Sequence, residues 1–239
     1  MAEKTRTTTR KVKDKWRSKA WYNVMAPDMF NRAKIAESFT DDAEKLVGRV
    51  TEVTVQEMTG DFMKAHIKMR FKVRTIIGSE AYTDFVGHVL TSDYIRRLTR
   101  RKRTKTDLAV DVELKDGFVV RVKPMAITEQ RIQSSQQTAI RNIMRSALLE
   151  MGRTSTLDEF VKKMISGEMS RDMAKAAKSI HPIQRVEIRR SEVITMGILP
   201  EIKPLPGERP EEAPPQAPEE QRPVEAEVSG SSDPDIEQS

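Results

Sequence analysis

Apolar and polar side chains alternate with a period of two from Met63 to Ile77. Because successive side chains of a strand point to opposite faces, this pattern predicts a half-buried antiparallel strand. Its polar face carries a ladder of cations that includes Lys68, Arg70 and Lys72.

A strand hairpin is predicted around the Lys-Asp-Gly sequence that ends at Gly117. A three-residue loop with Gly117 in the left-handed conformation places Val112 opposite Val120 and Asp111 opposite Arg121. A two-residue turn would instead set Val112 against Arg121. The longer loop is therefore favoured.

Apolar positions change to helical spacing in residues 129–180. The apolar stripe of the first predicted helix consists of Ile132, Ile140, Ile143, Met144, Ala147, Leu148 and Met151. Gly152 is expected to end this helix, and Thr156 is expected to cap a second one. A third short helix and a final strand over Ile183–Ile194 complete the pattern.

These periodicities predict an α+β fold with an antiparallel β-barrel-like core and two or three flanking helices. We expect one domain over residues 21–199, β-rich at about 45–126 and helical at about 129–180. Residues 1–20 have too few apolar groups to fold alone and are expected to form an extended basic arm. Residues 200–239 hold nine of the twelve prolines and no aromatic residue, which predicts a disordered acidic tail.

Charge is distributed unevenly between the predicted body and tail. The chain has a net charge of +6, but residues 200–239 hold eleven carboxylates against three cations, so residues 1–199 carry +14. Such a body favours a polyanionic partner. Nucleic acid is favoured over a membrane because no apolar run approaches the ~20 residues of a spanning helix. The absence of cysteine fits a reducing compartment.

Catalytic motifs are absent from the sequence. It contains no glycine-rich dinucleotide loop, Walker loop, nucleophile elbow or zinc-protease motif, and its three histidines are far apart in sequence. We therefore expect no enzyme activity, no cofactor, no metal and no small-molecule substrate.

The strongest functional signal is a basic segment of seven cations within ten residues. It consists of Arg96, Arg97, Arg100, Arg101, Lys102, Arg103 and Lys105. Phosphate contacts would neutralise so dense a charge and release counterions, which predicts RNA binding. A solvated loop between two strands is the alternative interpretation.

Three further sets of cations are candidates for RNA contacts. The ladder of Lys68, Arg70 and Lys72 either follows a phosphate backbone or pairs with an acidic strand carrying Asp107, Asp111 and Glu113. The arm contributes Lys11, Lys13, Lys15, Trp16, Arg17 and Lys19, which combine cations with an indole for base stacking. The predicted first helix and last strand contribute Arg141, Arg145, Arg189 and Arg190.

Aromatic side chains at the exit of the arm allow two interpretations. Trp21 and Tyr22 could stack on unpaired bases, as Trp16 could. We favour a core role instead, in which Trp21, Tyr22, Val24 and Met25 anchor the arm to the folded body.

Four separated blocks, covering about residues 11–196, resemble one known family. The first two blocks are Trp21–Pro27 with Met29-Phe30, and Leu46–Val53. The third consists of Arg121–Lys123, Ala126–Thr128, Ser134–Gln136 and Ala139–Arg141, and the fourth of His181–Ile183 and Arg185–Arg190. In this order they resemble the archaeal and eukaryotic small-subunit ribosomal protein family S-one-e, also called S-three-A-e. Met25 departs from the basic residue expected there, and the short acidic tail looks archaeal.

The resemblance implies a structural constituent of the small ribosomal subunit, cytoplasmic and without catalysis. It implies binding of ribosomal RNA at the platform, near the rRNA 3′ end and the messenger exit, beside neighbouring small-subunit proteins. Contact with messenger RNA stays open. The alternative is a free-standing RNA-binding translation or RNA-processing factor.

Overall fold

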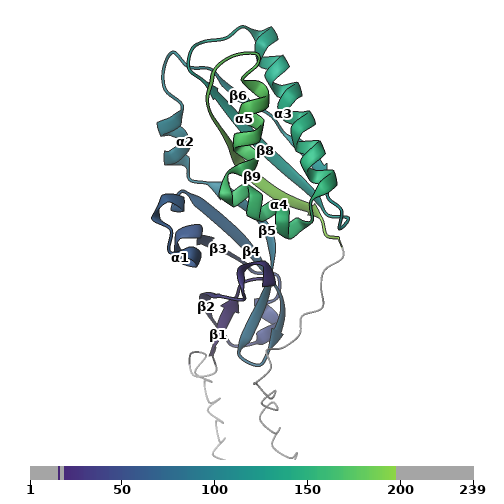
Figure 1. Ribbon diagram of the computed structural model, residues 1–239. Helices are drawn as coiled ribbons and strands as arrows, with labels where there is room; N and C mark the ends of the chain where they lie inside the picture. Colours follow the sequence, from purple (N-terminus) through teal and green to yellow (C-terminus); the bar gives the residue numbers. More distant parts are fainter. Residues whose placement is uncertain (1–15, 17–18, 198–239) are drawn as a thin grey trace, which may run out of the picture.

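The computed structural model describes Trp16 and residues 19–197 (Figure 1). The strands are β1 (Ala20–Met25), β2 (Lys34–Thr40), β3 (Val50–Thr54), β4 (Ile67–Ile77), β5 (Glu80–Leu90), β6 (Lys105–Asp107), β7 (Val110–Glu113), β8 (Val119–Thr128) and β9 (Ile183–Thr195). The helices are α1 (Val55–Thr59), α2 (Ser92–Leu98), α3 (Ser134–Thr154), α4 (Leu157–Ser166) and α5 (Glu168–Ala177), with short 3-10 helices η1 (Asp28–Phe30), η2 (Ala43–Leu46) and η3 (Phe62–Lys64). Most of the predicted arm and all of the predicted tail lie outside the described residues.

Strand β5 joins the two halves of one nine-stranded mixed sheet. One edge of β5 pairs with β4, which in turn pairs with β3. The other edge pairs with β1 over Glu80–Tyr82 and with β9 over Gly87–Val89. Beyond β9 lie β8 and then β6 and β7. The predicted α+β class is confirmed.

Two features differ from the predicted antiparallel barrel. The pairing of β1 with β5 is parallel. The described sheet is also not closed, because β1 and β9 share one edge of β5 and the sheet branches there. Helices α3, α4 and α5 cover the face formed by β8 and β9 (Figure 1).

The main hydrophobic core lies between these helices and the sheet. On α3, the buried side chains are Ile140, Met144 and Leu148, from the centre of the predicted stripe. The same core cluster includes Phe71 of β4 and Phe85 of β5. Residues of both halves therefore pack into the same core cluster.

Within residues 19–197, no helix combines the length and apolar character needed to cross a membrane.

Several elements predicted from local sequence signals are confirmed by the structure. The hairpin has the predicted register, with Val112 opposite Val120 and Asp111 opposite Arg121. Gly117 has a φ of 75°, in the left-handed region that glycine favours. The Thr156 hydroxyl accepts a hydrogen bond from the Glu159 N–H at 3.5 Å and caps α4. The third helix and the final strand are also confirmed.

Gly152 does not end α3, which continues to Thr154. A Cβ at this position would lie 2.0 Å from the Cγ1 atom of Val112. Glycine is required here because α3 and β7 approach each other closely, and not because the helix stops.

The alternating stretch from Met63 to Ile77 is a strand only from Ile67 onward. Met63 belongs to η3 and is 83% exposed, so the prediction that it faces the core is wrong. The cause is local: Thr54 and Glu57 form a capping box that starts α1, and the Asp61 side chain accepts a hydrogen bond from the Met63 N–H. Two helical turns therefore precede the strand.

The seam between β5 and β9 has only three residue pairs and contains a buried histidine. Nε2 of His88 lies 2.9 Å from the carbonyl oxygen of Ile188, and Nδ1 lies 2.6 Å from Oγ of Ser191. Because a carbonyl only accepts, Nε2 carries the proton and the Ser191 hydroxyl donates to Nδ1. Burial lowers the pKa of His88 to about 4.

We expect the buried His88 to make folding sensitive to mild acid. The unfolded chain takes up a proton near pH 6.5 and the native chain does not until about pH 4, so the stabilisation is present above pH 6.5 and is lost as pH falls. The free energy of unfolding should drop by roughly 1.5 kcal/mol between pH 6.5 and 5. Urea unfolding at several pH values measures this decrease in the free energy of unfolding. The decrease should be smaller in the variant His88→Gln, which has no imidazole at this position. Burial also lowers the pKa of His66, so this residue contributes to the pH dependence of stability as well. The variant His66→Gln measures that contribution separately. Equal pH dependence of the unfolding free energy in wild type and His88→Gln would contradict the prediction.

Candidate nucleic-acid interface

The basic segment 96–105 begins in α2 and ends in β6. Arg96 lies 4.0 Å from Asp93, and Lys105 lies 2.9 Å from Asp107. The other five cations have no ion-pair partner within the described part of the chain. These five are Arg97, Arg100, Arg101, Lys102 and Arg103, and all are exposed except the half-buried Arg103.

Both ends of the basic segment are fixed to the fold. At its start, Tyr94 stacks on His66 with ring centroids 3.9 Å apart, and its hydroxyl donates to Glu187 at 3.3 Å. At its end, the Thr104 N–H donates to the Thr128 hydroxyl at 3.3 Å, and the Thr128 N–H donates to the Thr104 carbonyl at 3.1 Å. The two ends of the chain segment that carries these cations are therefore tied to the folded body.

Three predicted RNA-binding cations from distant parts of the sequence meet around Asp107. Lys105 Nζ and Arg189 Nη1 lie 2.9 Å and 4.0 Å from its carboxylate. Nε of Arg141 donates a hydrogen bond to the backbone carbonyl of Asp107 at 3.2 Å. The Asp107 carboxylate thus pairs with two cations, and the Asp107 carbonyl binds a third. Three positive charges against one negative charge leave this surface positive. Lys105 belongs to both this cluster and the basic segment, so the two are continuous along the chain.

Two other predicted residues lie near this cluster in sequence but differ in their surroundings. Arg145 lies one turn beyond Arg141 on α3 and is exposed. Arg190, next to Arg189 on β9, forms an ion pair with Glu192 and is half-buried. Arg145 is therefore the more available of the two for a phosphate.

The ladder on β4 lies beside an acidic residue of the neighbouring strand β3. Arg70 forms an ion pair with Glu52 of β3 at 3.0 Å. Lys68 and Lys72 are exposed and have no ion-pair partner among residues 19–197. In the ladder, Arg70 is therefore neutralised by Glu52, whereas Lys68 and Lys72 are available for contacts with phosphates.

None of the three carboxylates expected beside the ladder lies on a strand that pairs with β4. Asp107 instead holds Lys105, and Asp111 makes two hydrogen bonds with Arg121, at 2.7 and 2.8 Å. Glu113 lies opposite Val119 in the hairpin. This correction arises because β7 pairs with β8, in a different half of the sheet from β4.

The exit of the arm carries an exposed aromatic cluster. Trp21 is 62% exposed and contacts Phe39 with centroids 4.7 Å apart, so its predicted core role is wrong. Trp16 is 70% exposed, stacks on Phe39 at 6.1 Å and lies beneath Lys19 Nζ at 4.1 Å. Val24 is buried, because strand alternation turns it inward and Trp21 outward.

The remaining predicted residues of the arm, Lys11, Lys13, Lys15 and Arg17, lie outside the described residues.

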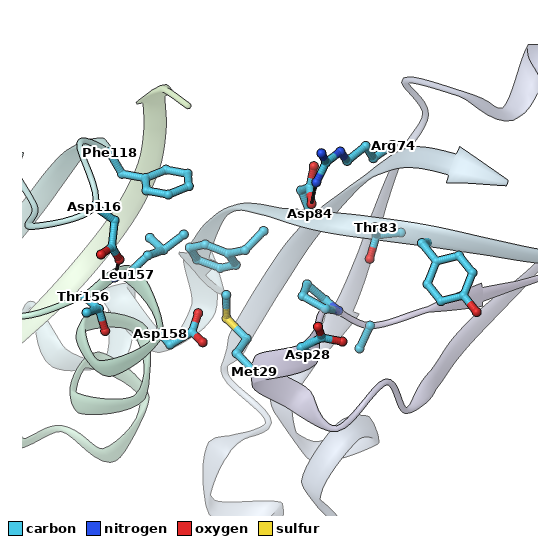
Figure 2. A pocket seen from close by; sticks show the side chains of 14 residues that line it. Asp28, Met29, Arg74, Thr83, Asp84, Asp116, Phe118, Thr156, Leu157 and Asp158 are labelled. Carbon is cyan, nitrogen blue, oxygen red and sulfur yellow. Dashed lines mark hydrogen bonds and ion pairs between the residues drawn. The ribbon is translucent and has the colours of Figure 1, made fainter. Parts of the chain in front are cut away.

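A hollow of about 310 Å³ between η1, β5, the 115–118 loop and α4 has the opposite charge (Figure 2). Its apolar lining includes Met29, Phe85 and Leu157, and its rim carries the carboxylates of Asp28, Asp84, Asp116 and Asp158. Burial raises the pKa of both Asp84 and Asp158.

Three of these carboxylates have structural partners. Asp84 lies 3.9 Å from Arg74, Asp28 pairs with Arg32, and Asp116 accepts a hydrogen bond from the Leu157 N–H at 3.0 Å. A rim of carboxylates repels phosphate, so this hollow is not part of the candidate interface. In residues 19–197, no three His, Asp or Glu side chains are grouped in a way that could hold a metal ion.

Phe62 and Met63 were not predicted as surface contact residues, yet they lie beside α2 and line a hollow with Tyr94 and Arg97. The missed signals were the Thr-x-x-Glu capping box at Thr54 and the Gly-Asp pair that follows α1. These signals mark helical turns where a strand was predicted.

Comparison with known proteins identifies the family to which the chain belongs. Residues 7–197 match the model of the Ribosomal S3Ae family. The proteins named small ribosomal subunit protein eS1 from Methanothrix thermoacetophila, Desulfurococcus amylolyticus and Methanopyrus kandleri are 41%, 42% and 40% identical to this chain. The alignments cover 74%, 77% and 77% of this chain and 83%, 86% and 89% of those proteins. This chain therefore belongs to the Ribosomal S3Ae family.

Proposed function

We propose that the chain is a structural, non-catalytic constituent of the small ribosomal subunit, in the cytoplasm, and binds ribosomal RNA through the basic segment 96–105 and the cations around Asp107. The observation that carries the RNA-binding role is the set of five cations without ion-pair partners between two fixed anchors. Family membership and relatives named as small-subunit proteins support the subunit assignment.

The physical mechanism is electrostatic docking on a scaffold. Each phosphate bound by a Lys or Arg releases condensed counterions, so affinity should fall steeply with salt. Because the contacts of Tyr94 and Thr104 tie both ends of the basic segment to the fold, its backbone loses less conformational freedom on binding than a free loop would. The ladder cations Lys68 and Lys72 and the cluster of Trp16 with Trp21 are secondary candidate contacts.

The place proposed within the subunit is the platform, near the 3′ end of the ribosomal RNA and the messenger exit. Neighbouring small-subunit proteins are the expected protein partners, since a platform protein is surrounded by both RNA and protein. A crosslink map of the intact subunit tests this location: crosslinks confined to another region would contradict it.

Density-gradient fractionation tests the structural role. A structural constituent should stay with the small subunit through a wash in about 0.5 M salt, because many simultaneous contacts must break before it leaves. A free-standing translation or processing factor should elute. Elution of most of the chain in the wash would contradict the proposal and favour the factor.

A further inference from the structure

Phe62 and Met63 form an exposed apolar pair that the local fold holds in place. They are 79% and 83% exposed, more than any other large hydrophobic side chain in the described residues. The Asp61 carboxylate accepts from the Met63 N–H at 3.0 Å, and the Ala65 N–H donates to the Phe62 carbonyl at 3.3 Å. Two adjacent apolar groups fixed in water mark a contact surface more strongly than single ones do.

The pair lines one side of a hollow of about 380 Å³ between η3 and α2. This size falls in the range of small-ligand pockets, roughly 300–1,000 Å³. The lining also includes Tyr94 and His66, whose rings stack, with the Arg185 guanidinium 5.7 Å from the Tyr94 ring centre.

The aromatic side of this hollow is uncharged at neutral pH. Burial lowers the pKa of His66 below its ordinary value and raises the pKa of Tyr94 to about 12. The hollow therefore offers flat, neutral rings and a thioether, the groups on which nucleobases stack.

The rim of the hollow is cationic. Arg97 lines it, and the chain continues directly into the exposed Arg100 and Arg101. Nearby carboxylates have their own partners: Asp61 pairs with Lys64 at 3.4 Å, and Glu187 with Arg185 at 2.7 Å. An apolar protein side chain would fill the hollow but leave these cations unpaired, whereas an unpaired nucleotide presents a ring and a phosphate together.

We propose that this hollow receives one unpaired nucleobase of an RNA strand whose phosphates are held by Arg97 and the cations that follow it. The inference rests on the proposed RNA-binding function and adds to it a preference for single-stranded over duplex RNA. Paired bases in an RNA helix are stacked inside it, and only an unpaired base can turn out into such a hollow.

Binding of fluorescent single-stranded and duplex RNA of equal length to the full chain, over a series of salt concentrations, tests the proposal. The double variant Phe62→Ala with Met63→Ala should bind single-stranded RNA about 10-fold more weakly, in line with the loss of one stacked base. Its duplex affinity and its slope of log K against log salt should be unchanged, because no phosphate contact is lost. Phe62→Trp should keep single-strand affinity, because the indole also stacks.

Val47→Ala with Val50→Ala is the matched control, since both valines are exposed and lie outside the hollow; it should bind like the wild type. Single-strand affinity equal to wild type in the Phe62 and Met63 variant would overturn the proposal and point to a protein occupant. A single Phe62→Ser variant gives the same test if the double variant does not fold. If the wild-type chain shows no salt-dependent binding of either single-stranded or duplex RNA, that result would overturn the proposed function itself.

Discussion

Gly87→Ala is expected to destabilise the fold by about 3 kcal/mol or more, as backbone clashes in a packed interior do. A Cβ at Gly87 would lie 2.1 Å from the carbonyl oxygen of Ser191 on β9. That atom belongs to the backbone, so relief requires β5 and β9 to separate. Gly87 is itself one of the three residue pairs that join β5 to β9, next to the buried His88, so separating the strands there would break this pairing and expose that histidine. Urea unfolding at pH 7.5 measures the loss.

Gly78→Ala is the matched control. Gly78 lies in the turn between β4 and β5 with a φ of 60° and nothing within 4 Å of a new Cβ. The only expected cost is backbone strain of about 1 kcal/mol. Equal unfolding midpoints for the two variants would show that the seam relaxes freely, contrary to its close packing.

Reversing three charges of the basic segment should abolish most RNA binding and leave the fold intact. The variant combines Arg100→Glu, Arg101→Glu and Arg103→Glu, three cations without carboxylate partners in the described part of the chain. Affinity for RNA at about 0.1 M salt should fall roughly 100-fold or more, and the slope of log K against log salt should decrease by about 2. Incorporation into small subunits should fall in parallel.

Stability separates a lost contact from a lost fold in this experiment. Exposed substitutions usually change the free energy of unfolding by less than about 0.5 kcal/mol each, so the thermal midpoint should move little. The control reverses Lys162, Arg171 and Lys178, three exposed cations on or next to α4 and α5. Equal losses of affinity in both variants would show that only net charge matters, and unfolding of the Arg100 variant would show a structural role. Because Arg103 is half-buried, its substitution could also affect folding. A variant that changes only the exposed Arg100 and Arg101 separates lost RNA binding from lost stability.

Features that depend on neighbours in sequence were predictable in detail. The hairpin register follows from a three-residue loop and from pairing Asp111 with Arg121, whose guanidinium now holds that carboxylate and lowers its pKa. The cap at Thr156 and the strand at β9 were likewise encoded within a few residues. Hydrophobic periodicity and capping act over one or two turns of chain, so a linear pattern reports them.

The candidate interface was predictable in its parts and not in its assembly. The density of cations between Arg96 and Lys105 is visible in the sequence. That Arg141 and Arg189 join Lys105 around Asp107 is not, because α3 packs directly on β6, and β6 and β9 both pair with β8, only in the folded chain. The sequence likewise showed Trp21 as a candidate anchor, and only the pairing with β2 shows its indole facing outward against Phe39.

Composition and local periodicity were enough to establish a basic α+β chain with helices after strands and a dense cationic segment. Long-range contacts decided the rest: the shared edge of β5 that keeps the sheet open, the approach of α3 to β7 at Gly152, and the hollow beside Phe62. The physical reason is that strand partners and close backbone approaches form between segments far apart in the chain. Their free energy comes from burial and excluded volume in the assembled core, and no short window of residues carries that information.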